Sequence, residues 1–116
     1  RAVPEDVLIV ASGSMTHNLR EFRGQGVNSP APDWVSGFAD WIADRVAAGD
    51  TDALLDFLDR SPSAARNHPT DEHFLPFFVA LGAATASGKQ WTGTPLHRSY
   101  TYGVIAMDTY RFDRAA

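Results

Sequence analysis

The stretch N-H-P-T-D-E-H-F-L-P, residues 67–76, organises the rest of the chain, because it holds two histidines, two carboxylates and two prolines within ten residues. The apolar run F-F-V-A-L-G follows at once and predicts a helix. Pro69 fixes its own φ and disfavours the helical region for His68. The helix is therefore expected to begin at Thr70, whose hydroxyl can cap the first turn. His73 would then fall in that first turn, and the His68 ring in the extended lead-in could converge with it.

The two histidines have two interpretations. A histidine near the start of a helix is often a capping or surface residue. Two histidines with carboxylates between them are instead typical of a site for zinc or non-haem iron, although two nitrogen ligands alone do not complete such a site. The residues by themselves leave both interpretations open.

Length and composition narrow the class of protein. The chain has 116 residues, 44% of them hydrophobic and 21% charged, which is typical of one soluble globular domain. Its net charge of −4 argues against a nucleic-acid or anionic-membrane surface, and no apolar run approaches the length of a membrane span. The absence of cysteine excludes disulfides and thiolate metal sites and fits a reducing compartment, so we expect a cytoplasmic protein. The chain begins with Arg1, and we expect it to be processed or cut from something longer.

A third candidate histidine follows the first apolar run of the chain. Residues 7–11, V-L-I-V-A, predict a strand buried in the middle of an α/β sheet. Residues 12–18, S-G-S-M-T-H-N, then form a turn of small residues that carries His17. The carboxyl ends of central strands commonly line a ligand crevice, so His17 is a candidate site residue. The alternative is a turn residue whose ring bonds the local backbone.

The remaining segments predict helices and a strand. Residues 20–32 predict a loop, and residues 33–48 predict a helix that ends at Gly49. The stripe on this helix is expected to be core, and it consists of Trp34, Phe38, Trp41, Ile42 and Val46. Asp50 or Thr51 can cap a second helix that stops at residues 61–62.

The last third of the chain is rich in β-formers. Residues 85–95 predict a flexible connector, and alternation from 104 to 112 predicts a strand, with Gly103 as a bend or bulge. The predicted fold class is α/β, a partial mixed-sheet α/β domain flanked by helices, with too few strands for a complete domain.

Three segments together carry a family resemblance: S-G-S-M-T-H-N-L at 12–19, H-P-T-D-E-H-F-L-P at 68–76 and G-V-I-A-M-D-T-Y-R-F at 103–112. In this order they resemble the C-terminal half of a class III extradiol ring-cleavage dioxygenase of the LigB-type superfamily, in its 4,5-DOPA dioxygenase branch. The His-Pro-Thr-x-x-His-x-x-x-Pro element is fairly specific. The resemblance implies that residues 1–116 are the C-terminal portion of a catalytic domain, a fragment of a larger LigB-like domain.

The resemblance also implies a chemistry. Proteins of this family use non-haem Fe(II), sometimes found replaced by zinc, and insert both atoms of O2 into a catechol beside its two hydroxyls. By resemblance His73 is a metal ligand, and His17 is a ligand or a catalytic acid/base. His68 is a second catalytic residue that holds substrate or oxygen, and His97 matches no motif.

The family's other metal-ligand histidines belong to an N-terminal half that this sequence does not contain. We therefore expect the chain alone to bind metal weakly. We also expect the strands at residues 7–11 and 104–112 to expose apolar surface that pairs with that half or with a second copy. Two other classes stay open: a catalytically silent binding or interaction module of the same fold, and a zinc-dependent hydrolase.

Overall fold

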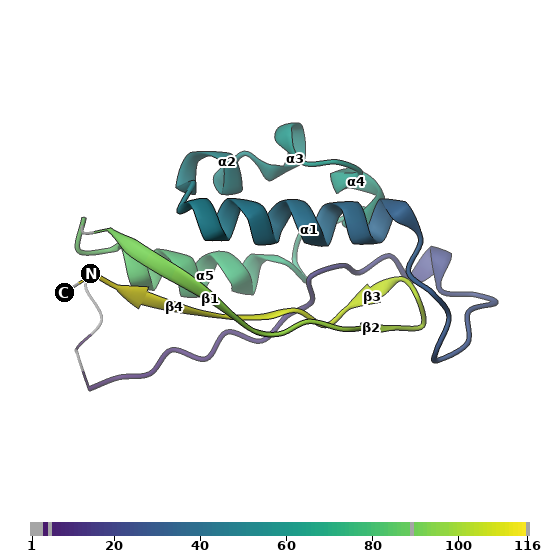
Figure 1. Cartoon of the computed structure of the whole chain (residues 1–116), viewed down its shortest axis with the longest axis horizontal. Coiled ribbons are helices and arrows are strands. Elements are labelled where there is room, and N and C mark those ends of the chain that lie inside the picture. Colours follow the sequence, from purple (N-terminus) through teal and green to yellow (C-terminus); the bar gives the residue numbers. More distant parts are fainter. Residues whose placement is uncertain (1–3, 5, 89, 116) are drawn as a thin grey trace.

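The computed structural model describes residues 4, 6–88 and 90–115, and it has the predicted α/β class (Figure 1). Helices α1 to α4 form one layer, and a twisted ribbon of strands crosses beneath α1, with α5 packed against β4. The strands form two antiparallel pairs, β1 with β4 and β2 with β3. In chain order the elements are η1 (Leu19–Glu21), α1 (Asp33–Ala48), α2 (Thr51–Leu55), α3 (Phe57–Arg60), α4 (Ala64–Asn67), α5 (Leu75–Thr85), β1 (Trp91–His97), β2 (Tyr100–Thr101), β3 (Ile105–Ala106) and β4 (Thr109–Arg114).

Helix α1 matches its predicted range and supplies the centre of the core. Gly49 ends it in the left-handed conformation, with φ of 64°, and bonds back to the last turn. The Asp50 carboxylate accepts from the Ala53 amide at 3.0 Å and so caps α2, as predicted. Of the predicted stripe, Phe38, Ile42 and Val46 are buried, and Trp34 and Trp41 pack against the core partly buried.

The predicted start of the next helix is wrong. Helix α5 begins at Leu75, because Pro76 is tolerated only in a first turn, where its missing N–H costs no hydrogen bond. The Thr70 hydroxyl caps nothing and donates instead to the Glu72 carboxylate at 2.8 Å. His73 consequently lies in the turn that precedes α5 and not inside the helix.

The predicted connector at 85–95 is wrong over its second half, where β1 begins at Trp91. Strand β1 pairs along its length with β4, and the Trp91 indole donates to the Thr51 hydroxyl at 2.8 Å. Gly93 lets the strand lie close to α1, because a Cβ there would collide with the Val46 side chain. Gly93, one of the residues that suggested a connector, therefore serves the close packing of a strand.

The predicted strand at 104–112 is divided in two. Strand β3 covers Ile105–Ala106 and β4 covers Thr109–Arg114, with a break between them. Gly103 is the predicted bend: with φ of 66° it turns the chain between β2 and β3. Within the described ranges, none of the helices combines the length and the apolar character that crossing a membrane requires.

The predicted buried strand at 7–11 is also wrong. The segment is extended but lies outside both strand pairs, and Figure 1 shows it in purple along the strand side of the molecule. Its side chains are largely exposed, with Leu8 at 85% and Val10 at 81%. A buried strand needs backbone partners on its edges and cover on both faces, and the described residues supply neither. Apolar surface is exposed at this segment, as expected, but at residues 104–112, where exposure was also expected, Val104 and Ala106 are buried.

Candidate active site

Residues 13–18, called here the His17 segment, are held by hydrogen bonds to distant parts of the chain. The Ser14 amide donates to the His73 carbonyl at 2.7 Å, and the His17 amide donates to the Asn67 carbonyl at 3.0 Å. These bonds tie the segment to both ends of the histidine-rich stretch. Two backbone amides of the segment are thus bonded although it belongs to no regular strand.

Thr16 anchors the same segment to the strands. Its buried hydroxyl donates to the Val104 carbonyl at 2.8 Å and accepts from the Ala106 amide at 2.7 Å. Sequence reasoning missed this residue, because its partners lie 88 and 90 positions away along the chain. A lone threonine between Met and His gives no periodic signal that would have found it.

Gly13 allows the close approach of the two histidine-bearing stretches. A Cβ at this position would lie 2.5 Å from the His73 carbonyl oxygen and 2.9 Å from the Pro76 ring. Both obstacles are stiff, one being backbone and the other a proline. The glycine is therefore required sterically where the His17 segment meets the turn before α5.

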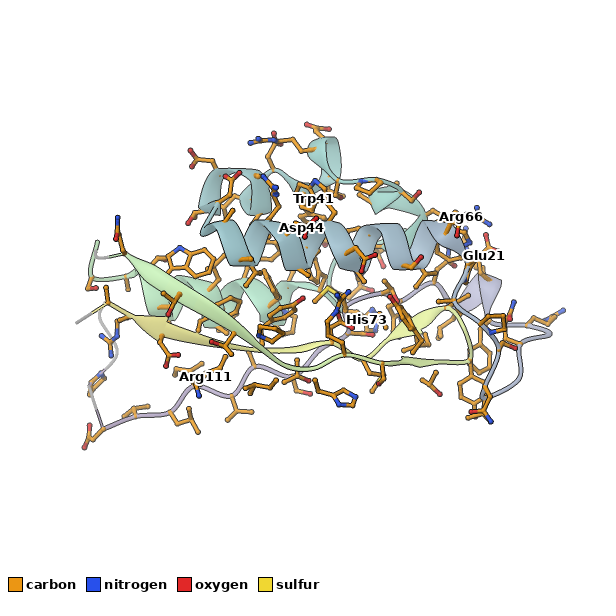
Figure 2. All side chains as sticks on the ribbon, in the orientation of Figure 1. Glu21, Trp41, Asp44, Arg66, His73 and Arg111 are labelled. Carbon is orange, nitrogen blue, oxygen red and sulfur yellow. The ribbon has the colours of Figure 1, made fainter. Side chains whose placement is uncertain are left out.

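The result is a stacked pair of imidazoles. The His17 and His73 rings are 3.5 Å apart between centroids and 11° from parallel. His73 is 44% exposed, with Nδ1 3.6 Å from the Glu72 carboxylate, and Figure 2 shows it near the middle of the molecule's long dimension. Burial lowers the pKa of His17, and the neighbouring His73 lowers it further, while Glu72 opposes the shift. His17 is therefore neutral near pH 7 and offers a lone pair.

Each imidazole is a suitable metal ligand, but the two rings cannot bind the same ion in this arrangement. An imidazole binds a metal through a ring nitrogen whose lone pair lies in the ring plane, at about 2.0–2.1 Å for zinc. Two nearly parallel rings separated by 3.5 Å cannot both have one ion in their plane. Among the described residues, moreover, no group of three or more His, Asp or Glu side chains is placed to hold a metal ion. The geometry thus offers one ligand with a second imidazole beside it.

A groove of about 380 Å³ opens next to this pair. His73 lies on its wall, and Phe74, Phe77, Met107 and Tyr110 contribute ring and thioether surface. Its size is within the usual range for small-molecule pockets, about 300–1,000 Å³.

His68, which the motif predicts to contact substrate, does not line the groove. Its side chain is buried, at 2% exposure, and Nε2 lies 2.7 Å from the Met15 carbonyl oxygen. The ring stacks on Phe74, with centroids 4.9 Å apart. Of the three predicted site histidines, the structure therefore brings His17 and His73 together and encloses His68 in the aromatic core behind them.

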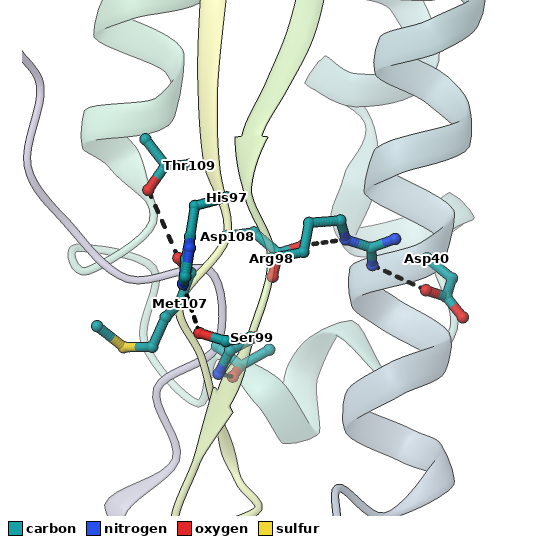
Figure 3. A network of polar contacts seen from close by, with 9 residues as sticks. Asp40, His97, Arg98, Ser99, Met107, Asp108 and Thr109 are labelled. Atoms are coloured by element: carbon teal, nitrogen blue, oxygen red, sulfur yellow. Dashed lines mark hydrogen bonds and ion pairs between the residues drawn. The ribbon is translucent and has the colours of Figure 1, made fainter.

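A polar network lies at the junction of β1 and β4, where Asp108 immediately precedes β4 (Figure 3). Arg98 bonds Asp40 of α1 and Asp108, both at 2.8 Å. Burial raises the pKa of Asp108, and Arg98 opposes that shift. His97, which matched no motif, is exposed and lies 2.6 Å from the Ser99 hydroxyl. It does not line the groove.

Tyr110 is the aromatic residue of the groove that carries a hydroxyl. That hydroxyl is buried and has no hydrogen-bond partner among the described residues. Burial, reinforced by the nearby Asp108 carboxylate, raises the pKa of Tyr110 to about 12. The phenol therefore stays protonated at neutral pH and contributes to the groove mainly as a ring.

The chain belongs to the LigB family of ring-opening enzymes. Residues 1–112 match the family model described as "Catalytic LigB subunit of aromatic ring-opening dioxygenase". The resemblance inferred from the three motifs is thereby confirmed at the level of the family.

Individual relatives agree with this placement. A "4,5-DOPA dioxygenase extradiol" of Beta vulgaris is 33% identical over 110 residues, which are 93% of this chain and 38% of that protein. A protein of the same name from Escherichia coli K12 is 37% identical over 82 residues, or 68% of this chain and 30% of that one. The crystal structure of the uncharacterized protein JW3007 from Escherichia coli K12 superposes with a TM-score of 0.68 at 27% identity, over 85% of this chain and 40% of that one. The chain thus spans well under half the length of these relatives.

Proposed function

We propose that this chain is the C-terminal portion of the catalytic domain of an extradiol ring-cleaving dioxygenase. Its substrates would be a catechol-type aromatic and O2, and its metal a non-haem Fe(II), for which zinc can substitute. The observation that carries the proposal is the stacked His17–His73 pair, with His73 on the wall of a groove made of aromatic and apolar side chains. Membership of the LigB family and the names of the relatives support the same class of reaction.

In this proposal His73 is the metal ligand. It lies in the turn before α5, and its carbonyl oxygen accepts from the Ser14 amide, so its backbone is fixed as a ligand requires. When bound, the ferrous ion supplies open coordination positions and the redox chemistry of O2. His73 also faces Glu72 at 3.6 Å, and a carboxylate beside a ligating imidazole favours one orientation of the ring.

His17 would move the proton. It is neutral near pH 7 and lies against the His73 ring, so it can take a hydroxyl proton from a bound catechol and return it later. Proton transfer by a positioned side chain typically contributes about 100- to 10,000-fold to a rate. A role of His17 as a second ligand would require one of the two stacked rings to rotate.

The other ligands would come from outside this chain. The described residues offer no third side chain for the metal at this pair, and the relatives are more than twice as long as the matched region. Both observations support a partner segment that completes the site, or else a second copy of this chain. The exposed apolar side chains of residues 7–10 are the surface on which such a partner would pack.

The test is metal analysis with turnover on the full-length protein that carries this chain. We expect one iron per site after anaerobic loading with Fe(II), and a ring-opened product from a catechol. Stoichiometric zinc with hydrolytic activity and no ring cleavage would instead indicate a zinc hydrolase. Absence of any bound metal and of any turnover would indicate a catalytically silent module, and either result would refute the proposal.

A further inference from the structure

His68 makes two contacts with residues close in sequence to the stacked pair, one near His17 and one next to His73. Its Nε2 lies 2.7 Å from the carbonyl oxygen of Met15, two residues before His17. A carbonyl can only accept, so Nε2 must carry the hydrogen and donate it. Its ring stacks on Phe74, the residue directly after His73, with an interplanar angle of 19°.

The rest of the His68 ring is enclosed. Phe38 meets it edge to face, with centroids 5.5 Å apart. Burial lowers the pKa of His68, so the ring is neutral and Nδ1 bears a lone pair. That Nδ1 is buried and has no hydrogen-bond partner in the described part of the chain. The ring therefore has a single polar contact, and that contact is to the His17 segment.

We propose that His68 is a positioning residue that holds the His17 ring against the His73 ring by bonding the Met15 carbonyl and stacking on Phe74. This inference rests on the proposed function for its catalytic meaning, because the pair it positions is the proposed ligand and proton carrier. Its geometry stands independently of that function. His68 would act on the reaction only through His17 and His73, and never by touching the substrate.

A positioning role differs from simple filling of the core. A core filler could be replaced by any ring of similar size, because only its volume and apolar contacts matter. A positioning residue also needs the N–H at the place of Nε2. His68→Phe keeps a ring on Phe74 but leaves the Met15 carbonyl without its donor, whereas His68→Gln puts an amide N–H near the same point.

The test is nuclear magnetic resonance of the 116-residue chain without metal or substrate. In the wild type we expect His68 to be the Nε2–H tautomer, and cross-relaxation between the ring protons of His17 and His73. The His68→Gln variant should keep that cross-relaxation. The His68→Phe variant should remain folded but lose it, with the His17 ring-proton shifts moving toward those of the exposed His97. His97→Gln is the matched control and should change neither signal.

Specific results of the same experiment would overturn the proposal. If folded His68→Phe keeps the His17–His73 cross-relaxation, His68 only fills the core and the proposal is wrong. If His68→Phe does not fold, the wild-type tautomer and His68→Gln still decide: an Nδ1–H tautomer, or loss of the ring contact in a folded glutamine variant, overturns the proposal. Since no readout uses metal or catechol, failure of the proposed dioxygenase function would show separately, as absence of turnover with the ring contact intact.

Discussion

Two neighbouring pieces of the chain, residues 7–12 and the His17 segment at 13–18, are held in opposite ways. The first has Leu8 and Val10 more than four-fifths exposed and belongs to neither strand pair. The second is bonded through Ser14, Thr16 and His17 to three other parts of the chain. The apolar piece is therefore held weakly by the rest of the chain, and the polar piece is held firmly.

The difference shows what fixes a segment in this protein. Apolar side chains stabilise a strand only where another element covers them, and the described residues leave the first piece uncovered. Polar groups that find buried partners are fixed by direction as well as by contact. The candidate active site therefore depends on hydrogen bonds of the His17 segment more than on the strand that precedes it.

Removing the Thr16 hydroxyl should have the largest effect on stability. Thr16→Val leaves the Val104 carbonyl and the Ala106 amide buried without their partner. Each unsatisfied group costs about 1–3 kcal/mol, so we expect a loss of about 3 kcal/mol in the free energy of unfolding. Urea unfolding measures it, with Thr70→Val as the matched control, because the exposed Thr70 bonds only Glu72. Equal losses in the two variants would show that Thr16 has no special role.

A side chain at Gly13 should have the next largest effect. Gly13→Ala pushes against the His73 carbonyl and the Pro76 ring, and overpacking of this kind typically costs about 1–3 kcal/mol. We also expect weaker contact between the His17 and His73 rings. Gly37→Ala on α1 is the control, because a Cβ there meets nothing within 4 Å. Full retention of stability in Gly13→Ala would contradict the close approach.

The pH dependence of stability should come from His17, in the fixed segment, and from His68, which bonds that segment. The pKa values of His17 and His68 are lowered from 6.5, in both cases first by burial. Below pH 6.5 the unfolded chain binds protons that the folded chain does not, so stability falls as pH falls, by at most about 1.4 kcal/mol per pH unit for each histidine. Unfolding titrations between pH 6.5 and about 5, above the range in which exposed carboxylates titrate, measure this slope.

Replacing both histidines separates their contribution to the pH dependence of stability from that of other groups. The double variant His17→Gln with His68→Gln should flatten the dependence between pH 6.5 and about 5, provided it folds. Each single variant should remove part of the slope. A slope that is unchanged in both single variants would mean that neither histidine is shifted by folding.

Changes in residues 7–12 should have the smallest effect on stability. Leu8→Lys and Val10→Lys alter exposed side chains, so we expect changes within about 0.5 kcal/mol. The same variants should reduce self-association in sedimentation experiments, because they place charge on the apolar surface. Loss of 2 kcal/mol or more, on the scale of about 2–5 kcal/mol for core truncations, would mean that residues 7–10 are buried in solution.

The sequence predicted the elements whose signals are local. The 3.6-residue stripe of α1, its glycine end and the Asp50 cap depend on neighbours within a few residues, and the structure confirms them. The family resemblance implied that His17 and His73 both lie at the metal, whereas the convergence expected from the residues themselves was that of His68 with His73. The structure stacks His17 on His73 and places the His68 ring on Phe74.

The failures share a cause, which is that partners distant in sequence decided the outcome. A five-residue apolar run predicts a buried strand, but only covering elements can bury residues 7–11. Strand β1 was missed because Gly93 and Pro95 indicate a loop unless the packing of Gly93 against Val46 is known. The motif that His68 shares with His73 predicted a contact with substrate, and it gave no signal of the bond from the His68 ring to the Met15 carbonyl, 53 positions away.

The central claim is that the stacked histidines divide two roles, with His73 holding the metal and His17 carrying the proton. The most direct test measures iron content and steady-state turnover of a catechol in the full-length protein that carries this chain. It compares His73→Ala and His17→Ala, with His97→Ala as the exposed control.

We predict that His73→Ala loses iron and activity together, whereas His17→Ala keeps at least part of its iron but loses about 100-fold or more in turnover. His97→Ala should resemble the wild type in both measurements. Full iron in His73→Ala together with loss of iron in His17→Ala would contradict the account and exchange the two roles.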